Sequence, residues 1–146
     1  MKRELLFRGK RVDNGEWVYG RGLQQCKDEL GNEIVAIFTD VVKSEKYIKK
    51  EGRYTLYYAP VRAETLEQYT GLKDKKGNKI FEGDILDYTL FDAFDEDHQY
   101  KGVVKWIDDC FICDNSDGFN GLAWAVNQSL ELEVIGNVTD NPELMK

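Results

Sequence analysis

Short apolar runs alternate with polar turns along the whole chain. The runs are rich in Val, Ile, Tyr and Phe, which are residues that favour strands. The predicted strands are residues 5–12, 16–23, 34–38, 54–58, 79–81, 84–90, 102–107, 110–113, 122–126 and 130–135. Strands this short and this closely spaced predict a mainly β fold made of small barrels or sandwiches, with short helical segments.

Three local patterns refine these strands. Asn14-Gly15 lies between the first two, and both residues tolerate positive φ, so the pair predicts a hairpin with a type I′ turn. The run that ends at Tyr58 is predicted to stop before Pro60, because proline cannot donate to a strand ladder. Leucine and valine alternate with glutamate over residues 130–134, which predicts a strand with one solvated face.

Helical signals are few. Residues 63–68 lack helix breakers, residues 41–50 are rich in lysine, and Asn141-Pro142 reads as a cap followed by proline in a first helical turn. The charge balance changes near residue 67. We therefore predict an N-terminal β subdomain, residues 1–66, and a C-terminal barrel-like subdomain, residues 67–146.

Composition favours a folded protein of the cytoplasm. The chain has 146 residues, of which 42% are hydrophobic, enough to bury a core although 32% are charged. No apolar run approaches the roughly 20 residues of a membrane-spanning helix, so no membrane partner is expected. The N-terminus lacks the apolar stretch of a signal peptide, and three cysteines, an odd number, fit a reducing compartment.

The net charge of −7 is unevenly distributed along the chain. Residues 1–66 carry +3 and residues 67–146 carry −10. The simplest interpretation is ordinary surface solvation, and the sharper one is an acidic face that repels nucleic acid and suits a basic protein partner. Edge strands and oppositely charged parts also leave a homo-oligomer open.

A basic, aromatic segment of the first part is the alternative contact region. Adjacent residues of a strand face opposite sides, so one of two neighbouring tyrosines is expected to be exposed beside positive charge. Basic side chains next to exposed rings are typical of single-strand nucleic-acid binding. The candidate contacts for nucleic acid or a partner are Lys49, Lys50, Arg53, Tyr57 and Tyr58.

The stretch QYTGLKDKKGNKIFEGDIL, residues 68–86, has the look of a ligand loop. A phosphate loop needs Gly-x4-Gly-Lys-Ser/Thr, but five residues separate Gly71 from Gly77, and Asn-Lys-Ile follows Gly77. The dinucleotide pattern Gly-x-Gly-x-x-Gly is absent as well. The lysines of this stretch are largely neutralised by Asp74, Glu82 and Asp84. We interpret the stretch as two turns that connect strands.

This stretch, with LEVIGNVTDNPEL at residues 132–144 and LFRGKRVDNGEWVYG at residues 6–20, resembles the YopX family of phage and prophage proteins. The resemblance implies a mostly β fold and a phage or prophage origin. The family has no established molecular function, so it supplies no catalytic residue. Its recurrent positions here are expected to set turns and packing: Gly71, Gly77, Gly83, Asp84, Gly136 and Asn137.

Metal and redox chemistry have weak support. His98 is the only histidine, in a predicted polar loop, residues 91–100, that two Phe side chains anchor; Asp92, Asp95, Glu96, Asp97 and His98 can offer ligands to a hard cation. Without a second cluster elsewhere, we interpret them as an exposed loop.

Cys110 and Cys113 have the spacing of a redox or zinc pair, but strand residues three apart face opposite sides, so we expect two buried structural cysteines. The three Trp residues lie in strand-like runs and are expected in the core.

The sequence therefore indicates a non-enzymatic binding or accessory module, without catalytic, metal or cofactor residues, that contacts a host or phage protein. Nucleic-acid binding through residues 43–58 is the alternative. A metal-dependent enzyme built on the acidic loop ranks third.

Overall fold

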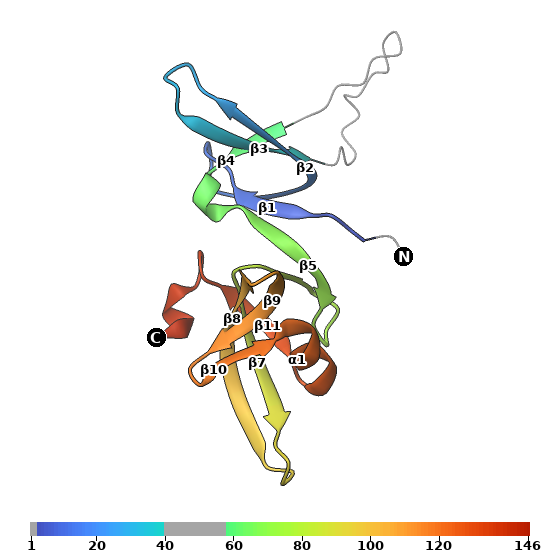
Figure 1. The fold of residues 1–146 in the computed structure, drawn as a ribbon. Helices are drawn as coiled ribbons and strands as arrows, with labels where there is room; N and C mark the ends of the chain where they lie inside the picture. The colour runs from blue at the N-terminus through green and yellow to red at the C-terminus, as the bar shows by residue number, and fades with distance from the viewer. Residues whose placement is uncertain (1–2, 40–57) are drawn as a thin grey trace. The chain divides into compact units, whose positions relative to one another are not determined.

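A computed structural model describes residues 3–39 and 58–146. Within them the chain is mainly β, as predicted. It divides into two compact units: an N-terminal unit, residues 4–68, and a C-terminal unit, residues 69–146 with Arg3. The sequence placed the boundary at residues 66 and 67. The strand β5 (Glu67–Lys73) passes from the first unit into the second (Figure 1).

The N-terminal unit is an antiparallel sheet that curls on itself. Its strands are β1 (Phe7–Lys10), β2 (Trp17–Lys27), β3 (Glu33–Thr39) and β4 (Tyr58–Val61), in the order β4-β3-β2-β1. An antiparallel bridge between Arg11 and Val61 brings β4 back to the end of β1. The enclosed core is apolar and consists of Val35, Ile37 and Val61 with Phe7, Val18 and Leu66 packed against them.

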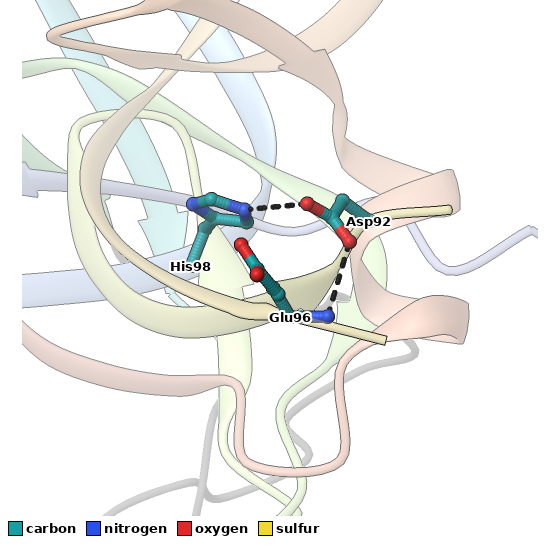
Figure 2. A group of neighbouring side chains, drawn as sticks. All are labelled: Asp92, Glu96 and His98. Atoms are coloured by element: carbon teal, nitrogen blue, oxygen red, sulfur yellow. Dashed lines mark hydrogen bonds and ion pairs between the residues drawn. The ribbon is translucent and has the colours of Figure 1, made fainter. Parts of the chain in front are cut away.

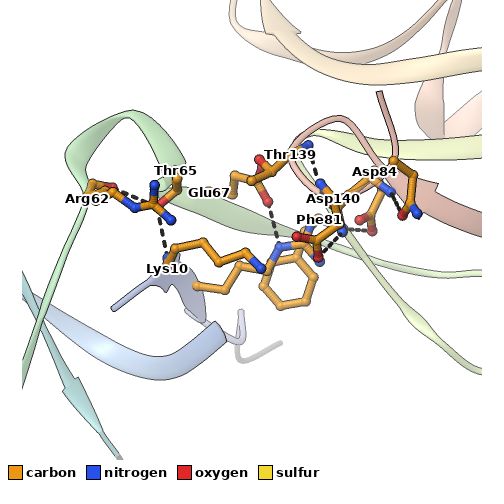
Figure 3. A network of polar contacts seen from close by, with 11 residues as sticks. Lys10, Arg62, Thr65, Glu67, Phe81, Asp84, Thr139 and Asp140 are labelled. Atoms are coloured by element: carbon orange, nitrogen blue, oxygen red, sulfur yellow. Dashed lines mark hydrogen bonds and ion pairs between the residues drawn. The ribbon is translucent and has the colours of Figure 1, made fainter. Parts of the chain in front are cut away.

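A short 3-10 helix, η1 (Ala63–Thr65), occupies the place of the helix predicted over residues 63–68. The Thr65 hydroxyl donates to the Arg62 carbonyl at 2.7 Å and accepts from the Lys10 N–H at 2.8 Å (Figure 3). The turn is therefore attached to β1. A strand follows at once, because β5 begins at Glu67 and pairs with β1 through Arg8.

The C-terminal unit contains a five-stranded antiparallel sheet in the order β10-β9-β8-β7-β11. Its elements are β6 (Lys79–Phe81), β7 (Asp84–Phe91), β8 (Asp97–Ile107), β9 (Cys110–Asn115), β10 (Gly118–Gly121), α1 (Leu122–Gln128), β11 (Glu133–Asn137) and the 3-10 helix η2 (Pro142–Met145). The helix α1 covers the sheet face that carries Tyr88 and Val104, where Leu122 and Ala125 are fully buried.

Several details differ from the sequence prediction. Residues 122–126 form the start of helix α1, not a strand, because Leu122 and Ala125, three residues apart, share its buried face. Pro60 lies inside β4, which it can do because β4 is the last strand in its sheet order. The strand predicted at residues 130–135 begins only at Glu133, and Leu130 is exposed.

The turn predicted at Asn14-Gly15 also differs from the structure. Gly15 has a φ of +69°, but Asn14 does not have positive φ, and the hairpin closes through a longer turn in which the Gly15 N–H donates to the Arg11 carbonyl. The predicted hairpin is therefore confirmed, whereas the predicted type I′ turn is wrong. A pair of positive φ values occurs instead at Asp108 and Asp109, between β8 and β9.

Candidate functional site

One turn design closes three hairpins of the molecule, and it explains the stretch that resembled a ligand loop. In the β5–β6 hairpin the Asp74 Oδ1 accepts from the N–H groups of Lys76 and Asn78, at 3.0 and 2.8 Å. Asp28 and Asp92 make the same two bonds in the β2–β3 and β7–β8 hairpins. The residue that needs positive φ is Gly77 in the first hairpin, at +85°.

Asp74 also reaches across the C-terminal unit. Its Oδ2 accepts from the backbone N–H of Val134 at 3.0 Å, and the Lys75 N–H donates to the Leu132 carbonyl. Burial acts to raise the pKa of Asp74, but the bonds from Val134 and Asn78 outweigh it and hold the pKa below its usual range. This carboxylate holds the β5–β6 hairpin against β11, so it serves structure and not ligand binding.

The other recurrent positions act in the same way. The Asp84 carboxylate is fully buried and accepts from the Phe81 N–H at 2.8 Å (Figure 3). Gly136 has no room for a side chain, since a Cβ would lie 2.7 Å from the Asn141 Oδ1. The Asn137 Oδ1 accepts from two following N–H groups. Gly77, Asp84, Gly136 and Asn137, four of the positions expected from the resemblance to set turns and packing, therefore do so here.

The β7–β8 hairpin forms a two-stranded arm, which we define as residues 89–99. Strand β11 pairs with β7 only over Asp84–Asp87, and β9 pairs with β8 only over Gly102–Ile107. The arm beyond these limits pairs only with itself, and Figure 1 shows it extending past the neighbouring strands. It replaces the predicted polar loop, residues 91–100.

The tip of the arm brings together part of the predicted acidic cluster. The His98 Nε2 lies 3.1 Å from the Asp92 Oδ2, and Glu96 completes a group of donor atoms within 4.8 Å of one another (Figure 2). The hydrogen bond that the imidazole makes to the Asp92 carboxylate raises the pKa of His98, and the same bond lowers the pKa of Asp92. The ion pair and the capped turn account for this grouping. Glu96 and His98 are exposed, and Asp92 is half-buried.

The base of the arm is fastened to the sheet by a polar network. The Tyr88 hydroxyl donates to the Asn120 Oδ1 at 2.8 Å, and the Asn115 Nδ2 donates to both Tyr88 Oη and Asn120 Oδ1, at 2.8 and 2.9 Å. The Tyr88 ring stacks on Tyr100 at 5.5 Å. Burial raises the pKa of Tyr88, so its hydroxyl stays protonated and able to donate.

The two cysteines of the Cys-x-x-Cys spacing lie on opposite faces of β9, as their spacing predicts. Cys113 is fully buried, and burial raises the pKa of its thiol to about 11. Cys110 is exposed, so the prediction that both are buried is wrong for it. The two thiols do not share a site.

Large apolar side chains lie exposed on the C-terminal unit. The prediction that two Phe anchor the loop is wrong, because Phe91 is 55% exposed and Phe94 is 86% exposed. Trp106 and Trp124 are about half exposed, although both were expected in the core. In α1, Trp124 is displaced from the buried face that Leu122 and Ala125 share, which explains the difference.

The predicted basic, aromatic contact region falls mainly outside the described residues. Lys49, Lys50, Arg53 and Tyr57 belong to that part of the chain. Tyr58 begins β4, is 63% exposed, and its ring meets Phe38 edge to face at 6.4 Å. Its exposure agrees with the expectation that one of the neighbouring tyrosines is open to solvent.

A hollow of about 340 Å³ lies beside the base of the arm. Its walls mix both charges with apolar groups, and they include Lys75, Asp87, Gln99 and Glu133. Lys76 and Glu133 form an ion pair at 2.5 Å within it.

The described residues include no helix with the length and apolar character that crossing a membrane requires.

Comparison with known proteins agrees with the fold. A crystal structure of protein EF1440 from Enterococcus faecalis is 26% identical, with a TM-score of 0.57, over 97% of this chain and 98% of that one. Protein yopX from Bacillus subtilis is 21% identical, with a TM-score of 0.49, over 97% and 95%. No curated protein matches. The pattern of the YopX protein family matches residues 6–146, and the chain therefore belongs to that family.

Proposed function

We propose that this YopX-family protein is a non-enzymatic binding module that contacts another protein through its C-terminal unit. The resemblance to phage and prophage proteins supports a phage origin, and a host or phage protein of the bacterial cytoplasm is then the partner.

The observation that carries this proposal is the set of large apolar side chains that the C-terminal unit leaves open to solvent. They include Phe91, Phe94, Trp106, Ile107, Phe119, Trp124 and Leu130. Trp and Phe are enriched where proteins contact one another and provide much of the binding energy there. Single exposed apolar residues are ordinary, but this unit exposes two of the chain's three Trp and three of its seven Phe.

Charge favours a protein over nucleic acid as the partner. Residues 67–146 carry a net charge of −10, which repels phosphate backbones and attracts basic surfaces. Affinity capture from a nuclease-treated bacterial lysate tests the proposal when a matched pair of variants is included. One variant replaces Phe94, Phe119 and Trp124 by Ser, and the control replaces Tyr19, Leu23 and Leu30, exposed residues of the N-terminal unit, by Ser.

A captured protein that the control variant retains and the C-terminal variant loses would support the module. Equal capture by both variants would contradict it. Circular dichroism shows whether each variant keeps its strands, so that loss of binding is not confused with unfolding.

The two other functions predict different outcomes. Nucleic-acid binding through the basic, aromatic region predicts capture of nucleic acid that weakens steeply with salt and is lost in Lys49→Glu/Lys50→Glu. Tyr58, the described member of that region, is exposed as this function requires. A metal-dependent enzyme predicts that divalent cations or a chelator change thermal stability.

A further inference from the structure

We propose that the arm, residues 89–99, is the element that docks, and that Phe94 inserts into an apolar pocket ringed by basic side chains of the partner protein. This inference rests on the proposed function and names the contact and the chemistry of the partner.

The arm presents a side chain at a defined position. Leu90 at its base is still buried in the core, but no third strand of the described residues lies beside the arm, and residues 91–99 are all exposed or half-exposed. Its base is held by the ring stack of Tyr88 on Tyr100 and by the bonds from Tyr88 and Asn115 to Asn120. The arm therefore projects while its origin in the sheet stays fixed.

Phe94 lies at the tip of this arm and is held there by the turn. Its backbone N–H donates to the Asp92 Oδ1 at 2.8 Å, and the Asp92 N–H donates to the Glu96 carbonyl at 2.9 Å. The Glu96 N–H donates to the same Asp92 oxygen (Figure 2). The tip is thus a closed, hydrogen-bonded loop. A ring carried by an ordered backbone loses little entropy on binding, which makes Phe94 an effective anchor.

Two phenylalanines share this tip, with Phe94 86% exposed and Phe91 55% exposed. Leaving such rings in water is unfavourable, because apolar surface gains free energy when it is removed from water. A partner that buries them regains part of that free energy. The pairing of Phe91 with Asp97 across the arm also puts acidic and apolar groups next to each other.

The charge at the tip defines the chemistry of the partner. Asp92, Asp95, Glu96 and Asp97 surround Phe94 in the sequence, and no Lys or Arg occurs between Lys79 and Lys101. Such a tip repels nucleic acid and anionic lipid surfaces. It complements a pocket rimmed by Arg or Lys, whose charges steer the encounter and pair with the carboxylates around the inserted ring.

The photoreactive residue p-benzoylphenylalanine, placed at position 94, tests this contact. The same residue at Leu30, an exposed position in the matching turn of the β2–β3 hairpin of the N-terminal unit, is the control. Each protein is irradiated in a nuclease-treated lysate of Enterococcus faecalis, the source of the relative EF1440. Both irradiations are then repeated with proteins that also carry Asp95→Asn/Asp97→Asn. This double substitution removes two charges from the tip and leaves Asp92 to hold the turn.

We expect a protein cross-linked at position 94 and not at position 30. Its yield should fall about fivefold or more in the Asp95→Asn/Asp97→Asn background, and similarly when salt is raised. A product insensitive to both changes, or one that is nucleic acid or lipid, would overturn the proposal.

Capture with the unmodified tagged protein runs alongside, so that two failures can be told apart. If capture depends on the exposed C-terminal residues but no product forms at position 94, the arm is not the docking element and the binding module stands. If nothing is captured or cross-linked, both proposals are overturned.

Discussion

The Asp74 Oδ2 accepts a hydrogen bond from the backbone N–H of Val134 at 3.0 Å, across 60 residues of sequence. The same carboxylate caps its own hairpin through Lys76 and Asn78. One side chain therefore closes a local turn and joins it to a distant strand, and it is 6% exposed. Its removal tests whether this motif is structural.

Asp74→Ala should destabilise the C-terminal unit by about 1–2 kcal/mol, because it leaves three part-buried N–H groups without their acceptor. Asp92→Ala removes the same capping bonds from an exposed turn and should cost less than about 1 kcal/mol. Urea unfolding followed by Trp fluorescence in a Trp17→Phe background reports this unit, since the remaining Trp residues lie in it. Equal losses in the two variants would contradict the long-range role of Asp74.

Acid should weaken the C-terminal unit through the same carboxylate. The pKa of Asp74 is lowered on folding, so its contribution to stability is complete above its ordinary pKa of 3.8 and is lost as the pH falls through the lower, folded value. Asp74→Asn, which cannot titrate, should be less stable at neutral pH and lose less stability below pH 4. Urea midpoints measured from pH 2 to pH 7 test this. Parallel curves for the two proteins would refute it.

The β8–β9 turn should be improved by glycine. Asp108 and Asp109 have φ of +48° and +64°, a conformation that costs an L-residue about 1–2 kcal/mol. Asp109→Gly relieves this strain but makes the unfolded chain more flexible, so we expect a net gain of about 0.5–1 kcal/mol. Ser116 is a turn residue without positive φ, so Ser116→Gly should lower the free energy of unfolding by roughly 0.5 kcal/mol. Thermal unfolding compares them, and a lower Tm for Asp109→Gly would rule out strain.

The ion pair at the arm tip should be visible in the titration of His98. Its pKa is raised above 6.5, chiefly by the hydrogen bond to Asp92, so any support that it gives the turn is complete below pH 6.5 and fades as the pH rises through the raised value. Asp92→Asn should lower the pKa measured by NMR from the imidazole protons. Asp97→Asn, which removes only a weaker charge effect, should lower it less. An equal fall in both variants would mean that the hydrogen bond is absent.

The three cysteines should differ in reactivity. Cys26 and Cys110 are exposed, whereas Cys113 is buried with a pKa of about 11. A thiol reagent should modify two thiols in the folded protein and the third only after denaturation. Cys110→Ser should reduce the fast count to one. A disulfide between Cys110 and Cys113, detected by mass spectrometry, would contradict their placement on opposite faces.

Much of this molecule was predictable from local pattern. Strand-forming residues and glycine-containing turns established the mainly β fold, and the spacing of Cys110 and Cys113 alone put their side chains on opposite faces, since strands alternate. The turn role of Gly77 also followed from sequence, because a positive φ is a local requirement. These features depend on neighbours along the chain, which a sequence displays directly.

Other features depend on contacts between distant segments. Residues 122–126 have the composition of a strand, yet burial of Leu122 and Ala125 against the sheet selects a helix. Asp74 meets Val134 only once the fold brings them together, and Phe94 is exposed because no third strand extends along the arm. Sequence alone indicated most of the strands and the turn role of glycines such as Gly77, whereas tertiary packing decided which side chains stay in water, because exposure depends on what the rest of the chain covers.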